Sequence, residues 1–526
     1  MADSKNNDID KTTVNTSLKK ITAGTIVVVF GTFLGALLFF LVRILIIKNW
    51  SQFDYGIFTA ALSIPVIILI FSTFGIGTIA VRNIAYARGL KDEKEITTLV
   101  TSFFSVFTIA GFVSGLLLYL LSDFIAYDIF NRPALALPLK IFSLALPITK
   151  IAQSLSGIFR GFDKVAPKIL FYDIIKHFIF LIIVFFIVIY ELDFINVYYA
   201  YIIAMVISCI LLYIYAVRKI SFHKFLNYKL LNKAKIKELI FLSAPIFIGT
   251  IITLFTNWID TFMILALKSP ESVAQYDSVV VLSATIAFPL GALTMIYMPI
   301  ISGLYIKKKY NEMKHIYKIL TKWLFFLTLP IFLTFILFPE IIIGFLYTSE
   351  YLIASRAMQI ICISSIATII LGLNSQNLVI TGKLKIILIA SIISAVVNIS
   401  LNYYLIPIYG INGAAFASMI SIIITNSFLS ILLYYYTKVQ PFSKNLIKPI
   451  VLVILSSLGI YYLFTTFIDI NVMFVAIFYI LMNLIFFISI IITKSVDKED
   501  LDMLISFERR TGIKLSFLKK LFEKAI

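Results

Sequence analysis

The chain has little charge and few residues of the kinds that build catalytic or metal centres. Only 14% of its 526 residues are charged, and it has 3 histidines and 2 cysteines. His177, His223 and His315 are far apart, and Cys209 and Cys362 lie in apolar stretches, which predicts neither a metal site nor a disulfide framework. Walker A, HExxH and paired-carboxylate motifs are also absent from the sequence. We therefore expect no catalytic residue, no metal and no cofactor, and a protein that is not an enzyme.

Apolar residues dominate instead, at 61% of the chain. The stretches 21–42, 56–81, 96–122 and 239–259 contain no charged residue, and neither does the stretch from Ile386 to Thr437. Because about 20 apolar helical residues cross a bilayer core, the sequence predicts an all-α polytopic membrane protein.

The pattern of apolar stretches predicts 14 transmembrane helices. They are expected at 21–46, 56–82, 96–121, 138–160, 168–190, 195–217, 239–267, 273–303, 316–338, 352–381, 384–406, 411–437, 446–468 and 470–493. Prolines such as Pro65, Pro147 and Pro289 lie inside these stretches, where they are expected to bend the helices.

Basic residues gather in the gaps after even-numbered helices, for example around Arg88, Lys224, Lys308 and Lys444. The positive-inside rule therefore places both termini in the cytoplasm. The expected location of the protein is the plasma (cytoplasmic) membrane of the cell. The same rule, with attraction to anionic lipid, explains the net charge of +18. We expect membrane lipids as partners and no nucleic acid.

The basic segment between the sixth and seventh helices divides the chain. Its apolar residues alternate with lysines at helical spacing, which predicts an amphipathic helix on the cytoplasmic surface. The expected organisation is a cytoplasmic tail at 1–20, an N-lobe at 21–217, a linker at 218–238, a C-lobe at 239–437, two further helices at 438–493 and an amphipathic cytoplasmic tail at 494–526.

The two lobes have the character of copies. At one constant offset, Tyr55 matches Tyr276, Ser154 matches Ser375, and Gly161 matches Gly382. An even number of helices in each copy predicts two six-helix lobes related by a pseudo-two-fold axis along the membrane normal. This is one plan of transporters that work by alternating access.

Charged and amide side chains inside spanning segments are costly and tend to be functional. The candidate cavity residues are Arg43, Lys48, Lys150, Gln153, Asn257, Asp260 and Asn374. Structural alternatives stay open: Lys150 could pair with a carboxylate such as Asp260, Arg43 and Lys48 could reach the outer interface, and Asn374 could bond to a neighbouring helix.

Two stretches resemble a known family. The text FDYGIFTAALSI with FSTFGIGTIAVRNIA, at 53–85, is similar to the opening of polysaccharide flippases. The text TGKLKIILIASIISAVVNISLNYYLIPIYGINGAAFASMIS, at 381–421, resembles the second-half signature of the multidrug, oligosaccharidyl-lipid and polysaccharide exporter superfamily. Fourteen helices fit the polysaccharide and lipid-linked-sugar branch, since multidrug exporters of the superfamily usually have twelve.

The resemblance implies a flippase that moves polyprenyl-phosphate-linked oligosaccharide from the inner to the outer leaflet, for cell-surface glycan synthesis. It also implies a cationic cavity that holds the phosphate. The expected partners are the lipid-linked saccharide and glycosyltransferases or a polymerase of the same pathway. Coupling to a Na⁺ or H⁺ gradient is an option. Two rivals remain: a cation-coupled multidrug exporter, and a membrane-embedded glycosyltransferase. The exporter predicts a cavity dominated by carboxylates.

Overall fold

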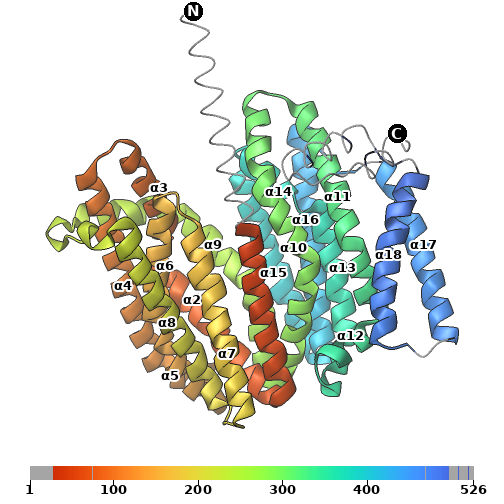
Figure 1. Cartoon of the computed structure of the whole chain (residues 1–526), viewed down its shortest axis with the longest axis horizontal. Helices are drawn as coiled ribbons and strands as arrows, with labels where there is room; N and C mark the ends of the chain where they lie inside the picture. The colour runs from red at the N-terminus through yellow and green to blue at the C-terminus, as the bar shows by residue number, and fades with distance from the viewer. Residues whose placement is uncertain are drawn as a thin grey trace, which may run out of the picture. The chain divides into compact units, whose positions relative to one another are not determined.

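The computed structural model describes residues 28–496 except 74, 443, 468, 469 and 494, together with Leu501, Glu508 and Lys519. In this part the chain is helical and contains no strand (Figure 1). The predicted tail at 1–20, the start of the first predicted helix and nearly all of the predicted tail at 494–526 lie outside the described residues.

Long helices form most of the structure. Those up to the middle of the chain are the first helix Val28–Asn49, α2 Gln52–Thr73, α3 Ile76–Gly89, α4 Glu93–Phe124, α5 Ala136–Ser143, α6 Ala145–Gly161, α7 Lys176–Ile189, α8 Ile195–Ile220, α9 Lys233–Leu267 and α10 Pro270–Ile306. The rest are α11 Tyr310–Leu337, α12 Pro339–Leu346, α13 Ser355–Leu371, α14 Asn374–Ile380, α15 Leu384–Tyr409, α16 Ile411–Thr437, α17 Lys444–Phe467 and α18 Val472–Ile492.

Short helical segments connect these elements. They are the π-helices η1 Ile125–Ile129 and η3 Lys168–Ile175, and the 3-10 helices η2 Pro133–Leu135, η4 Phe222–Phe225, η5 Tyr228–Leu230 and η6 Ser349–Ala354.

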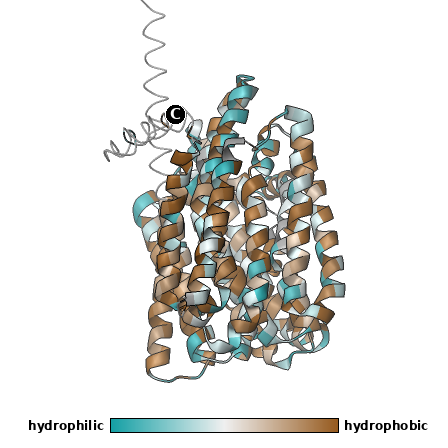
Figure 2. Cartoon of the chain, turned by 90° about the vertical axis from the view of Figure 1, so that its right-hand side faces the viewer, coloured by the Kyte–Doolittle hydropathy of each residue, from teal (hydrophilic) through white to brown (hydrophobic). Residues whose placement is uncertain are grey.

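Twelve helices of the described part are long and apolar enough to cross a membrane, and thirteen if one bent pair counts as a single span. Each of the 14 predicted segments coincides with observed helix. For the predicted segment at 239–267, which lies in α9, the part long enough to be counted is a shorter apolar helix, Asn257–Leu267. The all-helical membrane fold is confirmed, whereas the number fourteen stays a prediction. Figure 2 shows hydrophobic residues along the lengths of the helices and hydrophilic residues near their ends.

Three of the predicted helices are interrupted or bent within their length. The segment at 56–82 divides into α2 and α3, because Gly75 has a φ of 73°, a left-handed conformation that a right-handed helix cannot contain. The segment at 138–160 bends by 43° between α5 and α6. Pro147 causes this bend, since it has no N–H to donate to the carbonyl of Ser143. The segment at 352–381 divides into α13 and α14.

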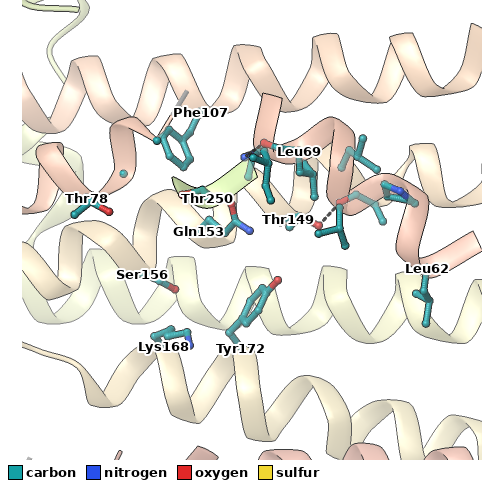
Figure 3. A pocket seen from close by; sticks show the side chains of 18 of the residues that line it. Leu62, Leu69, Thr78, Phe107, Thr149, Gln153, Ser156, Lys168, Tyr172 and Thr250 are labelled. Carbon is teal, nitrogen blue, oxygen red and sulfur yellow. Dashed lines mark hydrogen bonds between the residues drawn. The ribbon is translucent and has the colours of Figure 1, made fainter. Parts of the chain in front are cut away.

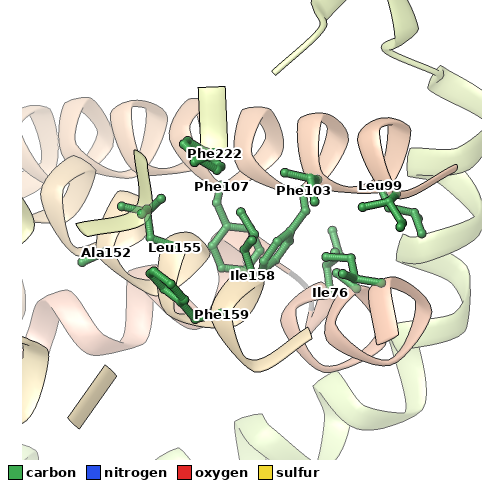
Figure 4. Close-up of a cluster of buried hydrophobic side chains, with 14 of the residues drawn as sticks. Ile76, Leu99, Phe103, Phe107, Ala152, Leu155, Ile158, Phe159 and Phe222 are labelled. Carbon is green, nitrogen blue, oxygen red and sulfur yellow. The ribbon is translucent and has the colours of Figure 1, made fainter. Parts of the chain in front are cut away.

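The predicted amphipathic helix between α8 and α9 was wrong. Ser221 has a φ of 50° and ends α8, and the two short 3-10 helices η4 and η5 follow. Phe222 is completely buried, with its ring against Phe104 of α4 and Tyr213 of α8 (Figure 4). Burial of this one aromatic ring outweighs the helical periodicity of the segment.

The chain forms two compact units, Met1–Asp277 and Ser278–Ile526. The division falls inside α10, whereas the sequence places the linker between lobes at 218–238. The repeat and the predicted lobe boundaries therefore stay predictions. In the first unit, one hydrophobic cluster joins α3, α4 and α6, with Ile76, Phe103, Leu155 and Phe159 among its members (Figure 4).

Candidate functional site: a basic cavity in the first unit

The first unit contains a cavity of about 640 Å³. It lies among α2, α3, α4, α6, η3, α8 and α9, and its basic lining residues are Lys150, Arg160 and Lys168 (Figure 3). Among the described lining residues there is no aspartate or glutamate. The uncharged polar lining residues are Thr78, Thr149, Gln153, Ser156, Tyr172, Tyr201 and Thr250. This lining is suited to an anion rather than a cation.

Lys150 is the deepest cation of this lining, with only 3% of its surface exposed. Its Nζ donates a hydrogen bond of 2.6 Å to the carbonyl oxygen of Leu69 and lies 5.2 Å from the centre of the Phe107 ring. The Leu69 carbonyl is near the C-terminal end of α2, where the helix dipole places partial negative charge. A buried ammonium is thus satisfied by a backbone oxygen and an aromatic face.

The end of α2 is positioned by the glycine that follows it. Gly75 adopts the left-handed conformation that ends the helix, and a side chain there would approach the backbone nitrogen of Phe247 to 3.2 Å. A non-glycine residue would therefore be strained by both its φ and its neighbour. Gly75 is what allows a helix to end beside Lys150.

Lys150 itself is positioned by close contact between α4 and α6. A side chain at Gly111 would come within 2.9 Å of both Lys150 Cβ and Pro147 Cα. Only glycine lets the two helices approach so closely. The lysine backbone is therefore held rigidly, while its long side chain extends along the cavity wall.

The opposite wall comes from η3, an eight-residue π-helix. It contributes Lys168 and Tyr172 to the cavity, which Figure 3 shows on the side away from Phe107 and Thr78. Lys168 also forms an ion pair of 3.3 Å with Asp173. π-helical turns in longer helices are frequently found at functional sites.

Of the seven predicted cavity residues, the structure brings Lys150 and Gln153 together in this cavity. Arg43 lies outside its lining: Nη1 of Arg43 is 2.6 Å from Oδ2 of Asp277 and 3.4 Å from Oη of Tyr55. The expectation that Arg43 and Lys150 line one cavity therefore gains no support from this lining.

The other four residues are dispersed. Lys48 and Asn257 are exposed, and Asp260 is buried and accepts a hydrogen bond of 2.7 Å from Tyr276. Asn374 belongs to the second unit, where its Oδ1 accepts a 2.6 Å hydrogen bond from Tyr317. For Asn374, this contact is the interhelical bond that the sequence leaves open as an alternative.

Sequence reasoning missed Lys168, Tyr172 and Asp277. Lys168 and Tyr172 are four residues apart, which marks one face of a helix, but nothing in the sequence predicts a π-helix. Asp277 directly follows Tyr276, the residue that matches Tyr55 in the repeat. The position of Asp277 beside a repeat-matched tyrosine was the only feature of the sequence that could have drawn attention to it as the partner of Arg43.

Comparison with known proteins agrees with this architecture. A family model described as polysaccharide biosynthesis protein matches residues 21–305, more than half of the chain, and the MatE model matches residues 245–404. A curated relative, an uncharacterised membrane protein of Methanocaldococcus jannaschii, is 26% identical over 413 residues, which cover 74% of this chain and 78% of that protein.

Solved structures show the same fold. The lipid II flippase MurJ in an inward closed conformation has a TM-score of 0.68 at 18% identity, covering 87% of this chain and 97% of that one. A multidrug resistance MATE family transporter in an inward-facing conformation has a TM-score of 0.62 at 14% identity, covering 77% and 94%. A transporter from Pyrococcus furiosus, described by the reverse polarity of its binding pocket, has a TM-score of 0.56 at 13% identity, covering 80% and 95%.

The family match covers the first unit from residue 21 onward, including the helices that surround the basic cavity, and the fold is that of known transporters and a flippase. The chain is a multi-pass membrane protein of the polysaccharide biosynthesis protein family, within the multidrug, oligosaccharidyl-lipid and polysaccharide exporter superfamily of transporters.

Proposed function

We propose that this protein is a flippase that moves a lipid-linked oligosaccharide, carried on a polyprenyl phosphate, from the inner to the outer leaflet. The observation that carries the proposal is the cavity lining: three basic side chains, with Lys150 buried among them, and no carboxylate among the described lining residues. The match to a polysaccharide biosynthesis family and the likeness to a lipid II flippase support the same choice.

The physical problem of such a reaction is the phosphate. Moving an anion through a low-dielectric environment is costly unless the charge is paired and hydrogen-bonded. Lys150 can supply that pairing by exchanging the Leu69 carbonyl, a neutral acceptor, for a phosphate oxygen, a charged one. The saccharide would travel in the cavity while the prenyl chain stays in the bilayer.

The aromatic lining suits the carried sugars. The aromatic residues of the lining are Phe103, Phe107, Phe142, Tyr172 and Tyr201. Its volume of about 640 Å³ is within the roughly 300–1,000 Å³ of ordinary ligand sites, which is enough for a phosphate and the first sugars rather than for a long glycan. The proposal also includes glycosyltransferases or a polymerase as pathway partners, and coupling to a Na⁺ or H⁺ gradient.

Export of organic cations is the alternative, and the match to the MatE model over 245–404 favours it. A cation would, however, be repelled by Lys150, Arg160 and Lys168, and the described lining offers no carboxylate to bind it. We therefore rank the anionic substrate first and include a cationic one in the test.

The test measures lipid-linked glycan in the outer leaflet of cells whose own flippase is deleted. Lys150→Met should lower export by at least about tenfold, as loss of one charged hydrogen bond predicts, and Lys150→Arg should retain more activity because it keeps the charge. Lys322→Met, which removes a buried lysine of the second unit that bonds to Ser495 O, is the matched control for insertion and expression.

If Lys150→Met exported glycan at the wild-type rate while being expressed at the same level as the Lys322→Met control, phosphate handling by Lys150 would be contradicted. Resistance to organic cations conferred by the wild-type protein, without glycan export, would replace the flippase by the multidrug exporter.

A further inference from the structure

A second polar cluster of the first unit lies outside the cavity lining. Asp277, near the start of α10, accepts two hydrogen bonds of 2.6 Å at its Oδ2, one from Arg43 of the first helix and one from Tyr55 of α2. The guanidinium of Arg43 also lies 4.7 Å from the ring centre of Phe39. One carboxylate thus joins three helices.

Neighbouring contacts join the same segments. Nε2 of Gln275 donates a hydrogen bond of 2.8 Å to Oε1 of Gln52. A side chain at Gly56 would overlap the carbonyl oxygen of Pro270, so the backbones of α2 and α10 are in direct contact there. The turn between the first helix and α2 is therefore fixed to the start of α10 by backbone contact, a neutral hydrogen bond and an ion pair.

Burial distinguishes this ion pair from the others in the described part of the chain. The Arg43 and Asp277 side chains are 11% and 10% exposed, whereas Lys140 and Asp123, an ion pair of similar length, are 33% and 55% exposed. Exposed pairs contribute little, but separating a buried pair leaves charges without solvent. Such a pair favours one arrangement of its helices strongly over another.

We infer that Arg43, Tyr55 and Asp277, with Gln52 and Gln275 beside them, form a latch that keeps the basic cavity closed to the outer side and must open in each transport cycle. Loop charge places the turn at 49–52 and the turn before Pro270 on the outer side. α10 continues past Asp277 into the second unit, so the latch fixes the helix through which the chain passes from one unit to the other.

The latch gives Arg43 a role different from the one its position in the sequence suggests. In the sequence Arg43 is a candidate phosphate ligand; in the structure its Nη1 contacts a carboxylate and a phenol oxygen. Opening of the latch separates the Arg43 guanidinium from the Asp277 carboxylate, whose attraction is strong because both are little exposed. Closing restores the ion pair. This inference rests on the proposed transport function only in assuming that the cavity opens to both sides.

The first test reads accessibility and needs no substrate. A single cysteine replaces Thr149, which lines the cavity, in a chain carrying Cys209→Ser and Cys362→Ser, and an impermeant thiol reagent is added outside intact cells. Asp277→Asn should raise the labelling rate about tenfold, the ratio expected for loss of a charged hydrogen bond, and Arg43→Gln should do the same. The double variant should label no faster than either single one.

The matched control is Asp123→Asn, which removes the exposed ion pair with Lys140 and should leave the labelling rate unchanged. Equal labelling rates for Asp277→Asn and Asp123→Asn would overturn the latch. Because the readout is access to a cavity cysteine, this result stands even where the flippase proposal fails, in which case wild-type glycan export itself is absent.

A second measurement covers variants that fold poorly. In the same cysteine-free background, cysteines at Gln52 and Gln275 are joined by a short bifunctional thiol reagent, with cysteines at Asp123 and Lys140 as the control pair. Joining 52 to 275 should lower export at least about tenfold, because the cross-link prevents the opening motion that each transport cycle requires. Joining the control pair should leave export unchanged. Unchanged export after the first pair is joined would also overturn the latch.

Discussion

In the described part of the chain, each unit contains a buried lysine of a membrane helix whose Nζ contacts a backbone carbonyl, and these two lysines differ in what surrounds them. Lys150 of α6 contacts Leu69 O at 2.6 Å and lines a basic cavity. Lys322 of α11, 2% exposed, contacts Ser495 O at 3.2 Å just after α18, and it is not among the lining residues of the apolar 350 Å³ cavity described in its own unit. A buried lysine is therefore evidence of a substrate site only when open space adjoins it.

The buried amides follow the same division. In the second unit, Tyr317 donates to Asn374 and Tyr297 donates to Asn377 at 2.9 Å, so these amide oxygens are already satisfied by protein. In the first unit, Gln153 and Tyr172 form a side-chain hydrogen bond with each other, and both line the cavity. Polar contacts between helices therefore adjoin open space in the first unit, whereas those of Asn374 and Asn377 are fully buried between helices.

The largest effect should come from placing a negative charge beside Lys150 in the cavity. Gln153→Glu places a carboxylate in the lining that holds Lys150. An opposite charge at about 4 Å is worth roughly 4 kcal/mol at an effective dielectric constant of 20, so it should occupy the lysine and abolish glycan export. Export is measured in the outer leaflet, with Gln359→Glu in α13 as the control amide of the second unit.

Export by Gln153→Glu at the level of Gln359→Glu would remove the distinction between the two units. Gain of organic-cation export by Gln153→Glu would sharpen it, because the charge beside Lys150 would then select the substrate.

A smaller effect should follow from breaking the amide network of the second unit. Tyr317→Phe and Asn374→Leu should each lower the free energy of unfolding by about 0.5–2 kcal/mol, as measured for polar contacts between membrane helices. Export per folded molecule should be unchanged. Thermal unfolding in detergent measures the first quantity, and the double variant should lose no more than the worse single one because both belong to one hydrogen bond.

Loss of export by Tyr317→Phe without loss of stability would contradict the structural role of this network and place the second unit in contact with substrate.

An effect on stability of similar size, with no direct effect on substrate, should come from the glycine that ends α2. Gly75→Ala forces an alanine into a left-handed conformation, which costs about 1–2 kcal/mol, and the thermal midpoint should fall accordingly. Gly89→Ala is the control, since a side chain there meets open space. A midpoint equal to that of the control would mean that the end of α2 is not fixed by this residue.

The sequence predicted the helical membrane fold because apolar length and loop charge are properties of the chain itself. It located Lys150 and Gln153 for the same reason: both are polar residues in a spanning segment. It predicted the superfamily because the stretches at 53–85 and 381–421 resemble known members. The break at Gly75 was missed because hydropathy carries no information on backbone conformation, whereas the bend near Leu144 agrees with the expectation that Pro147 bends its helix. The pairing of Arg43 with Asp277 was missed because it joins helices far apart in the sequence.

The central claim is that Lys150 makes the cavity a phosphate site, and binding to purified protein tests it most directly. Wild-type protein in detergent should bind a short-chain polyprenyl diphosphate at least about tenfold more tightly than the corresponding neutral prenol, one charged hydrogen bond being worth that ratio. Lys150→Met should lose this preference and Lys322→Met should keep it. Equal binding of the two lipids by wild-type protein, or an undiminished preference in Lys150→Met, would contradict the account.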